Sequence, residues 1–426
     1  MLFLSKVTAV LMGAGSRGRD AFGAYAKNNP HKLEIVAVAE PDPIKRNRLA
    51  DELEIPEARR FEDWKDLLSV GKIADGAIIA TMDDLHVEPS IEAMKLGYDI
   101  LLEKPMDRTL EGSIKIALAS QKYGKRVMVC HVLRYSLFFS KLRELMHSGI
   151  IGRIMGIEHK ENIGYFHMAH SFVRGNWRNS KETAPIILTK SCHDMDLLYW
   201  LVGEKCTYIS SFGELSHFRR ENMPEGAAER CTQGCLVEKE CPYSAIKIYL
   251  GDNVDWPVNV ISTDLSYEGR LKALNEGPYG RCVYACDNDV VDHQVVSMTF
   301  GKDVMVNFTL SAFTREISRT IRVFGTMGEI RGHFEKNELE VTRFGKEPEV
   351  IKIEDPGIGG HNGADYHMMN AFVEMLSNEE YEGTLTSAMD SLESHLMAFA
   401  AEESRLNNKV INMEEYRKEK LYGSGR

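Results

Sequence analysis

The stretch that decides the fold is KVTAVLMGAGSRG, residues 6–18. It begins as a short apolar strand and ends with Gly13, Gly15 and Gly18 in G-x-G-x-x-G spacing. A helical pattern follows, so the glycines lie at a strand-to-helix turn, the context in which this spacing indicates dinucleotide binding. Gly13 makes the tight turn, Gly15 lets the backbone reach a pyrophosphate, and Gly18 lets the helix approach the sheet. The alternative is a glycine-rich structural turn.

Strand and helix patterns alternate through the rest of the first third. Strands separated by helices of this length predict βαβ units and a parallel sheet. We therefore expect a Rossmann NAD(P)-binding domain over residues 1–131, in an α/β fold. The expected strands include LEIVAVAEPD (33–42), GAIIAT (76–81), DILLEKP (99–105) and RVMVCHV (126–132).

The rest of the chain has a different texture. From residue 152 to about 344 the sequence alternates apolar and polar residues, with glycines typical of hairpins. This pattern predicts an α+β domain over 132–426 with a large, mostly antiparallel sheet. A Cys-rich insertion is expected at about 215–289, and C-terminal helices at 365–408.

Composition limits the classes of binding partner and the cellular compartment that we expect for this protein. The chain has 426 residues, a formal net charge of -11 and no basic block, so neither nucleic acid nor an anionic membrane is an expected partner. The sequence lacks an apolar run long enough to span a membrane and a recognisable signal peptide, so we expect a cytoplasmic protein. In that reducing compartment the eight cysteines are expected to be thiols or metal ligands.

Cofactor choice depends on the end of the second strand. Glu40 lies 22 residues beyond Gly18, where a carboxylate can accept hydrogen bonds from a ribose diol and repel a 2′-phosphate. This favours NAD, although Lys45, Arg46 and Arg48 just beyond are able to receive that phosphate and keep NADP as the alternative. The residues expected to contact the dinucleotide are Gly13, Gly15, Ser16, Arg17, Gly18, Glu40, Thr81, Asp83, His86, Glu103, Lys104 and Pro105.

Lys104 is the first catalytic candidate. The apolar strand DILL, residues 99–102, runs directly into Glu103, Lys104 and Pro105. Ligands bind at such strand ends in open α/β sheets. A lysine at a dry strand end beside a nicotinamide can exchange a proton near neutral pH, and Glu103 is placed to orient it. The alternative is a solvated surface lysine.

These motifs together resemble the Gfo/Idh/MocA oxidoreductases, which include glucose–fructose oxidoreductase and inositol dehydrogenase. GAGSRG, AEPD, ATMDDLH and LLEKPM occur in that family's order and spacing, and SCHDMDLLYWLVG resembles its H-x-x-D stretch. The resemblance implies hydride transfer between a nicotinamide and a sugar-like carbinol, with Lys104 helping to move the hydroxyl proton. It also implies a cis bond before Pro105, and a homodimer or homotetramer formed through the sheet of the second domain.

The H-x-x-D stretch supplies the other catalytic candidates. His193 is the natural general base for a carbinol, and Asp196, on the same helical face, is expected to hold His193 or the substrate. Inositol dehydrogenase-like members carry an aspartate four residues before the histidine, where this chain has Thr189. The following Lys190 is expected to bind a carboxylated or phosphorylated substrate or to carry the proton. The alternative for His193 is a buried structural histidine.

The loop GYFHMAHSFVRGNWRN, residues 164–179, reads as substrate-facing because it is rich in hydrogen-bond donors and aromatic rings. Its alternatives are a polar loop packed at a domain interface and, for its His-x-x-His spacing, half of a metal site. The full set of expected substrate-binding residues is His131, Arg134, His167, His170, Arg174, Trp177, Arg178 and His361.

Five cysteines cluster in the expected insertion. Cys231, Cys235 and Cys241 are spaced C-x3-C-x5-C, and Cys282 and Cys286 are spaced C-x3-C. Four of the five would suit a structural zinc ion, which would hold this polar segment together. An iron–sulfur cluster is the first alternative, with the Cys-Pro pair at Cys241 as a hint, and free thiols are the second.

The expected function is therefore an NAD(H)-dependent oxidoreductase acting on a sugar, inositol or related polyol. One alternative is an NAD-dependent glycosidase that works by transient oxidation and elimination. The other is a non-catalytic sensor of NAD or sugar, against which the presence of both Lys104 and His193 argues.

Overall fold

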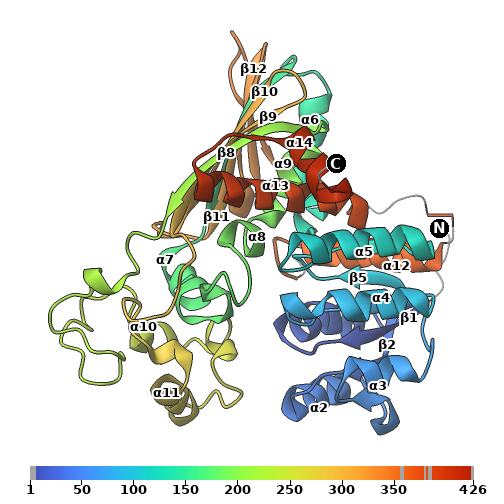
Figure 1. Ribbon diagram of the computed structural model, residues 1–426, viewed down its shortest axis with the longest axis vertical. Coiled ribbons are helices and arrows are strands. Elements are labelled where there is room, and N and C mark those ends of the chain that lie inside the picture. The colour runs from blue at the N-terminus through green and yellow to red at the C-terminus, as the bar shows by residue number, and fades with distance from the viewer. Residues whose placement is uncertain (1–5, 356–358, 379, 382–385, 424–426) are drawn as a thin grey trace.

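The structure, a computed structural model, describes residues 6–355, 359–378, 380–381 and 386–423. Figure 1 shows a first sheet with its helices at the lower right, a second, larger sheet at the top, and an insertion at the lower left. Both sheets have the strand directions expected from the sequence. None of the helices in the described part is long and apolar enough to span a membrane.

The first sheet is parallel throughout, with the described strands in the order β3-β2-β1-β4-β5-β6. Its strands are β1 (Val7–Met12), β2 (Leu33–Ala39), β3 (Arg60–Phe61), β4 (Gly76–Ile79), β5 (Asp99–Leu102) and β6 (Val127–Val129). Its sequential helices are α1 (Ala24–Asn28), α2 (Pro43–Glu52), α3 (Trp64–Ser69), α4 (Val87–Lys95) and α5 (Leu110–Tyr123).

A helix from far along the chain completes the cover of this sheet. In α12 (Ala364–Ser377), Phe372 and Leu376 lie so close to Gly76 that a Cβ atom added there would come within 3.1 Å of both side chains. Gly76 opens β4, so α12 packs directly on the first sheet. Asp365, at the start of α12, pairs with Arg17 after β1, so this helix also reaches the carboxyl ends of the parallel strands. The division of the chain at residue 131 stays a prediction.

The second sheet is mixed, with the described strands in the order β14-β13-β12-β11-β7-β10-β9-β8-β15. Strands β7 and β10 pair in parallel, and the other pairs are antiparallel. The strands are β7 (Ile154–Asn162), β8 (Cys206–Glu214), β9 (His293–Phe300), β10 (Val304–Ser311), β11 (Ser318–Gly325), β12 (Gly328–His333), β13 (Glu338–Arg343), β14 (Glu349–Lys352) and β15 (Ile411–Asn412).

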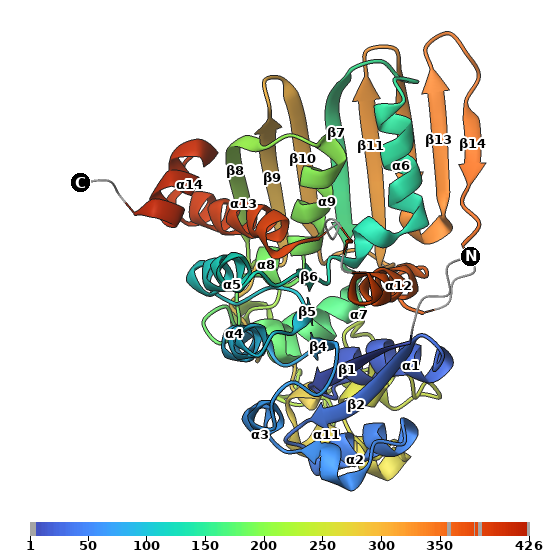
Figure 2. The ribbon, with the colours of Figure 1, turned by 90° about the vertical axis from the view of Figure 1, so that its right-hand side faces the viewer.

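Helices cover one face of the second sheet, as Figure 2 shows. The C-terminal helices expected at 365–408 are α12 and α13; residues 379 and 382–385 between them lie outside the described part. The covering helices are α6 (Leu137–His147), α9 (Cys192–Val202), α13 (Ala388–Asn407) and α14 (Met413–Tyr422).

The insertion between β8 and β9 has a small apolar core of its own, formed by Ala245, Tyr249, Val258 and Leu274. It contains α10 (Ala245–Tyr249) and α11 (Tyr267–Glu276). The sequence pattern in this segment indicated only a polar region poor in periodic apolar residues. That interpretation missed the core because its residues lie in short helices and turns, which are too brief to show a helical or strand-like hydrophobic periodicity.

Candidate active site

The glycine turn has the geometry expected of a dinucleotide site. Gly13 has a φ of +96°, and a Cβ atom there would lie 2.3 Å from the carbonyl oxygen of Ala80. A Cβ atom at Gly18 would lie 1.9 Å from the carbonyl oxygen of Gly13, so both positions require glycine. At Gly15 a Cβ atom would meet nothing within 4 Å. The open side of the turn is therefore at Gly15, where a pyrophosphate would lie.

Glu40 lies at the edge of the same turn. Its Oε2 accepts a hydrogen bond from the backbone N–H of Ala14 at 2.7 Å, and its Oε1 accepts one from Asp42 at 3.1 Å. The carboxylate is half-buried. A carboxylate fixed beside the glycine turn suits a ribose diol, so the residues present fit NAD.

Arg17 connects this turn to the catalytic strand end. Its Nε donates to Glu103 at 2.6 Å, and its Nη2 donates to Asp365 of α12 at 2.7 Å. Although burial alone raises the pKa of Asp365, Arg17 and His361 outweigh it and hold that pKa well below its usual range. Glu103 is thus engaged by Arg17, in addition to a contact with the backbone N–H of Lys104 at 3.1 Å.

Lys104 reaches across to the second domain. Its Nζ donates a hydrogen bond to the carbonyl oxygen of Thr189, at 2.8 Å, where α8 (Ile186–Thr189) ends. The Lys104–Pro105 peptide bond is cis, as the resemblance implied. The ring of His86 lies between the carbonyl oxygens of Pro105 at 2.9 Å and Thr81 at 3.2 Å. His86 and Thr81 therefore brace the strand end that carries the lysine.

His193 lies at the start of α9, next to this lysine. Burial is the main reason that its pKa falls well below the usual value, and the positive charge of Lys104 is the second. Its Nδ1 is buried and has no hydrogen-bond partner among the described residues. A neutral imidazole with a free nitrogen beside an amine is suited to accept a hydroxyl proton.

Further histidines surround His193. The ring centroid of His131 lies 5.8 Å from that of His193, and the ring of His361 lies 6.1 Å from it. His131 also lies 5.7 Å from His395 of α13. Burial lowers the pKa of His131 well below the usual value and that of His395 to about 3. The lowered pKa values keep the rings of His131 and His395 neutral, so these two histidines add no positive charge at the site.

Lys190 belongs to a charge network on the floor of the site. Its Nζ lies 3.2 Å from Glu161 of β7, which pairs with Arg319 of β11 at 2.5 Å. Arg319 in turn donates to Asp194 at 3.0 Å, and His159 contacts the same Asp194 oxygen at 2.8 Å. Burial lowers the pKa of Lys190, and Glu161 opposes that shift. Two cations and two carboxylates alternate here, so the network carries little net charge.

Asp196 does not hold His193, contrary to expectation. Both of its oxygens accept hydrogen bonds of 2.6 Å from the guanidinium of Arg134. The two side chains form a buried, bidentate ion pair, and a bidentate guanidinium is a stronger partner for a carboxylate than a neutral imidazole. Arg134 directs its Nε and Nη2 at Asp196, and substrate binding by Arg134 stays a prediction.

The segment 164–179, expected to be a substrate-facing loop, is largely helical. Its first helix, α7 (Tyr165–His167), is followed by a π-helical turn, Met168–Arg174. His167 lies near Lys190, whose charge helps burial to lower the pKa of this histidine. The ring of Trp256, from the insertion, lies 4.9 Å from that of His167. Trp177 donates its indole N–H to the buried Asp83 at 3.0 Å. The loop therefore bridges the two domains at Trp177 and faces the site at His167.

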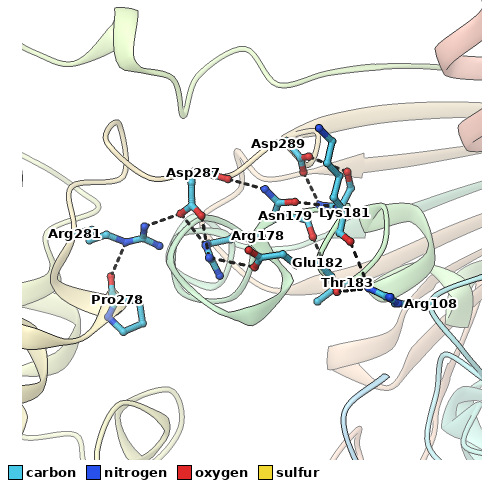
Figure 3. Close-up of polar contacts among 11 residues, drawn as sticks. Arg108, Arg178, Asn179, Lys181, Glu182, Thr183, Pro278, Arg281, Asp287 and Asp289 are labelled. Atoms are coloured by element: carbon cyan, nitrogen blue, oxygen red, sulfur yellow. Dashed lines mark hydrogen bonds and ion pairs between the residues drawn. The ribbon is translucent and has the colours of Figure 1, made fainter. Parts of the chain in front are cut away.

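Three residues of this loop do not face substrate, and those predictions are corrected. His170 bonds the hydroxyl of Tyr249 at 2.9 Å and stacks on Tyr279, inside the insertion. Arg178 makes two hydrogen bonds to Asp287, at 2.8 and 2.9 Å, as Figure 3 shows. Arg174 is directed into the insertion and donates to the carbonyl oxygens of Arg281 and Tyr243, both at 2.7 Å. Each side chain packs against the insertion because that segment folds over this side of the loop.

The expected zinc site is not found. None of the eight cysteines forms a disulfide. Across the described residues, no three His, Cys, Asp or Glu side chains are arranged to hold a single metal ion. The thiol of Cys286 donates to the backbone carbonyl oxygen of Cys282 at 3.3 Å.

Some contacts of the site escaped sequence reasoning. Asp365 pairs with Arg17 although 348 residues separate them, and the acceptor for Lys104 is a backbone carbonyl, which carries no side-chain signal. Glu161 and Arg319 lie at buried positions of strands in which buried and more exposed residues alternate. A charged residue at a position where this alternation predicts burial was the signal that could have identified them.

Comparisons with known proteins agree with this geometry. The model of the oxidoreductase family with an NAD-binding Rossmann fold, Gfo/Idh/MocA, matches residues 7–131. The model of the same family's C-terminal alpha/beta domain matches residues 143–413. The two matches span the first sheet, the catalytic candidates and the second sheet.

Among curated relatives, the chain is 22% identical over 385 residues to YteT of Bacillus subtilis strain 168, whose name describes it only as an oxidoreductase. That match covers 84% of this chain and 86% of YteT. This chain is also 26% identical over 277 residues to the inositol 2-dehydrogenase of Arthrobacter sp. strain FB24, and that match covers 64% of this chain and 75% of the Arthrobacter enzyme.

Among solved structures, the chain is similar to a levoglucosan dehydrogenase in complex with NADH and levoglucosan, with a TM-score of 0.71, 18% identity and coverage of 96% and 100% of the two chains. It is equally similar to an Agrobacterium radiobacter oxidoreductase in complex with NAD+, L-tartaric acid and magnesium, with a TM-score of 0.71, 15% identity and coverage of 96% and 99%. At these identities the likeness shows the fold alone.

Proposed function

Because the chain belongs to the Gfo/Idh/MocA oxidoreductase family, we propose that it is an NAD-dependent dehydrogenase that oxidises a carbinol of a sugar, inositol or related polyol. One observation carries the proposal. Lys104, bonded to the carbonyl oxygen of Thr189, lies close enough to His193 for its charge to join burial in lowering the pKa of that ring, and the buried Nδ1 of His193 has no hydrogen-bond partner among the described residues.

The roles of the residues follow from their contacts. The glycine turn, open at Gly15, binds the pyrophosphate, and Glu40 accepts hydrogen bonds from the ribose hydroxyls. NAD, when bound, supplies the acceptor for the hydride. Lys104 donates a hydrogen bond to the reacting oxygen of the substrate, and neutral His193 takes the hydroxyl proton.

The charge network favours a neutral substrate. Lys190 was expected to bind a carboxylate or phosphate, but Glu161 lies 3.2 Å from its Nζ. Arg319 is likewise paired with Asp194. Paired cations attract an additional anion weakly, because their fields are cancelled by their carboxylates. Hydroxyl groups of a neutral polyol can donate to Glu161 and accept from Lys190.

The uncovered face of the second sheet supports assembly with a second copy. Tyr208, Phe212, Val295 and Met305 project from β8, β9 and β10, and the side chains of Phe212 and Met305 are each 64% exposed. Apolar side chains gathered on one sheet face are typical of an interface. We expect sedimentation analysis to find a homo-oligomer that Phe212→Glu converts to monomers; a monomeric wild type would exclude it.

The direct test is a substrate screen with NAD. Neutral sugars, inositols, uronates, sugar phosphates and aryl glycosides are each incubated with enzyme and NAD, and formation of reduced nicotinamide is followed. We expect turnover with a neutral sugar or polyol and little with the phosphates. Aryl-group release with no net reduced nicotinamide would instead indicate glycoside cleavage, and binding without any turnover would indicate a sensor.

A further inference from the structure

Four of the five clustered cysteines line one small hollow in the insertion: Cys231, Cys235, Cys241 and Cys282. About 340 Å³ of this hollow, open solvent included, is not filled by protein atoms, but only about 20 Å³ admits the centre of a water molecule. Organic ligands occupy pockets of roughly 300–1,000 Å³ that enclose them, so this hollow is too tight for one. Four cysteines around one hollow are instead a donor set for a compact inorganic group bonded directly to the sulfurs.

The partners of Arg174 favour an anionic group in this hollow. Its side chain is 1% exposed and lines the same hollow. Its Nε and one terminal nitrogen bond backbone carbonyls, while Nη1 is buried without a partner in the described part of the chain. Glu238 lines the same hollow and accepts a hydrogen bond from Ser244, and no ion pair joins Arg174 to Glu238 or to any other described carboxylate. Burying an uncompensated cation is costly, so a negative charge is expected beside it.

We propose that Cys231, Cys235, Cys241 and Cys282 hold a [4Fe–4S] cluster. Each thiol loses its proton and binds a different iron, which gives a cluster with net negative charge facing Arg174. A single tetrahedral zinc ion would draw the four sulfurs to within about 3.8 Å of one another, as its Zn–S distance requires. No described group of residues is arranged around one ion in that way.

Hydrogen bonds to sulfur support the assignment. The backbone N–H of Ala245 lies 3.4 Å from the Sγ of Cys231, and Nη2 of Arg174 lies 3.8 Å from the same atom. Such bonds stabilise thiolates that bind an iron–sulfur cluster. Cys286 does not line the hollow, which makes it a matched control from the same spacing motif.

The position of the hollow gives the cluster a structural role. Arg174 ends the π-helical turn that begins at Met168, directly after His167 on the substrate side. A cluster bonded to the insertion and facing Arg174 therefore fixes the insertion against the back of the substrate loop. It also holds Trp256 over His167. No electron transfer is involved in this role.

The test uses the full chain, purified without oxygen and reconstituted with ferric iron, sulfide and a thiol reductant. We expect about four iron and four sulfide per chain, a broad visible absorbance, and a paramagnetic signal after reduction. Cys286→Ser should keep this content, whereas Cys235→Ala should lose most of it, with NAD binding as the check that the variant is folded.

Other outcomes overturn the proposal. Wild-type protein that takes up no iron and sulfide, or that carries about one zinc per chain, excludes the cluster whether or not any variant folds. Full iron and sulfide content in Cys235→Ala excludes the ligand assignment. An equal loss of iron and sulfide in Cys286→Ser and Cys235→Ala also excludes the ligand assignment. These measurements do not depend on turnover, so they stand apart from the proposed dehydrogenase activity.

Discussion

Lys104 of the first domain donates a hydrogen bond to the main-chain carbonyl of Thr189 in the second, with 2.8 Å between nitrogen and oxygen. A backbone carbonyl at the end of a helix is fixed in place and does not titrate. It therefore orients the amine of Lys104 at any pH at which the protein is folded. The next residues lead into α9, which carries His193. Orientation of the amine and placement of the base therefore depend on the same short segment.

We predict that Glu40 determines the preference for NAD over NADP. Replacing it in Glu40→Ser removes the acceptor for the ribose hydroxyls and the charge that repels a 2′-phosphate. We expect NAD to bind about tenfold more weakly, the equivalent of about 1.4 kcal/mol, and NADP to bind more tightly. Titration calorimetry with both cofactors measures this. Glu34→Gln, on the same strand but paired with Lys6 at the surface, should change neither affinity; an unchanged NAD-to-NADP ratio in Glu40→Ser would refute the assignment.

Arg17 should matter for stability even without cofactor. Arg17→Met leaves Glu103 and Asp365, which are 8% and 7% exposed, without their shared cation. Removing one partner of a buried ion pair typically costs about 3 kcal/mol. Urea unfolding of the cofactor-free protein measures the loss. Arg19→Gln, whose partners Asp20 and Glu52 are more exposed, should cost less than about 1 kcal/mol. Equal losses in the two variants would contradict the buried network.

His193 should act as a base over an unusually wide pH range. Because burial and then Lys104 lower its pKa, the ring stays neutral as the pH falls through about 6.5. We expect kcat/KM to remain level from about pH 7.5 to about pH 6, and His193→Asn to lower kcat about 100-fold or more. His147→Gln, a histidine bonded to Leu201 away from the site, is the control. A kcat/KM that falls with an apparent pKa near 6.5 would argue against this role.

Buried histidines should make the fold sensitive to acid. In the folded protein the pKa of His395 is about 3 and that of His170 about 4, chiefly through burial. Between those values and about 6.5 the unfolded chain binds more protons, so stability is present above pH 6.5 and declines below it. For His395 alone the loss at pH 5 is about 2 kcal/mol.

His395→Gln tests this prediction. His395 accepts a hydrogen bond from the backbone N–H of Met106 at 2.9 Å, and its other nitrogen contacts the carbonyl oxygen of Ser391 at 2.7 Å. An amide can both accept and donate but does not titrate. We expect the difference in unfolding free energy between pH 7.5 and pH 5 to shrink by about 2 kcal/mol in the variant. An unchanged difference would show that His395 does not contribute to the acid sensitivity.

The sequence predicted the parts of the site whose signals are local. The glycine turn, Glu40 and the lysine at the end of β5 each follow from a strand and the residues directly after it. Parallel strands end at the same edge of a sheet, so these residues had to lie together. His193 could be placed near them only through the family resemblance, because its neighbours in sequence do not reveal the lysine opposite.

The predictions that went wrong concern long side chains with distant partners. Arg178 in an irregular loop can equally reach a substrate or another segment, and its partner Asp287 lies 109 residues away. Asp196 shares a helical face with His193, but Arg134, 62 residues earlier, binds both of its oxygens. Spacing identifies which side chains share a face, and it does not identify which of several partners in space is the strongest.

The most direct measurement compares Lys104→Ala with wild type, using the best substrate from the screen. We expect kcat to fall about 100-fold or more while the Kd for NAD stays within about threefold, because the amine acts on the reacting oxygen and not on the pyrophosphate. Lys122→Ala, an exposed lysine on α5, should match wild type in both. Wild-type turnover by Lys104→Ala would contradict the central claim that this amine takes part in the reaction.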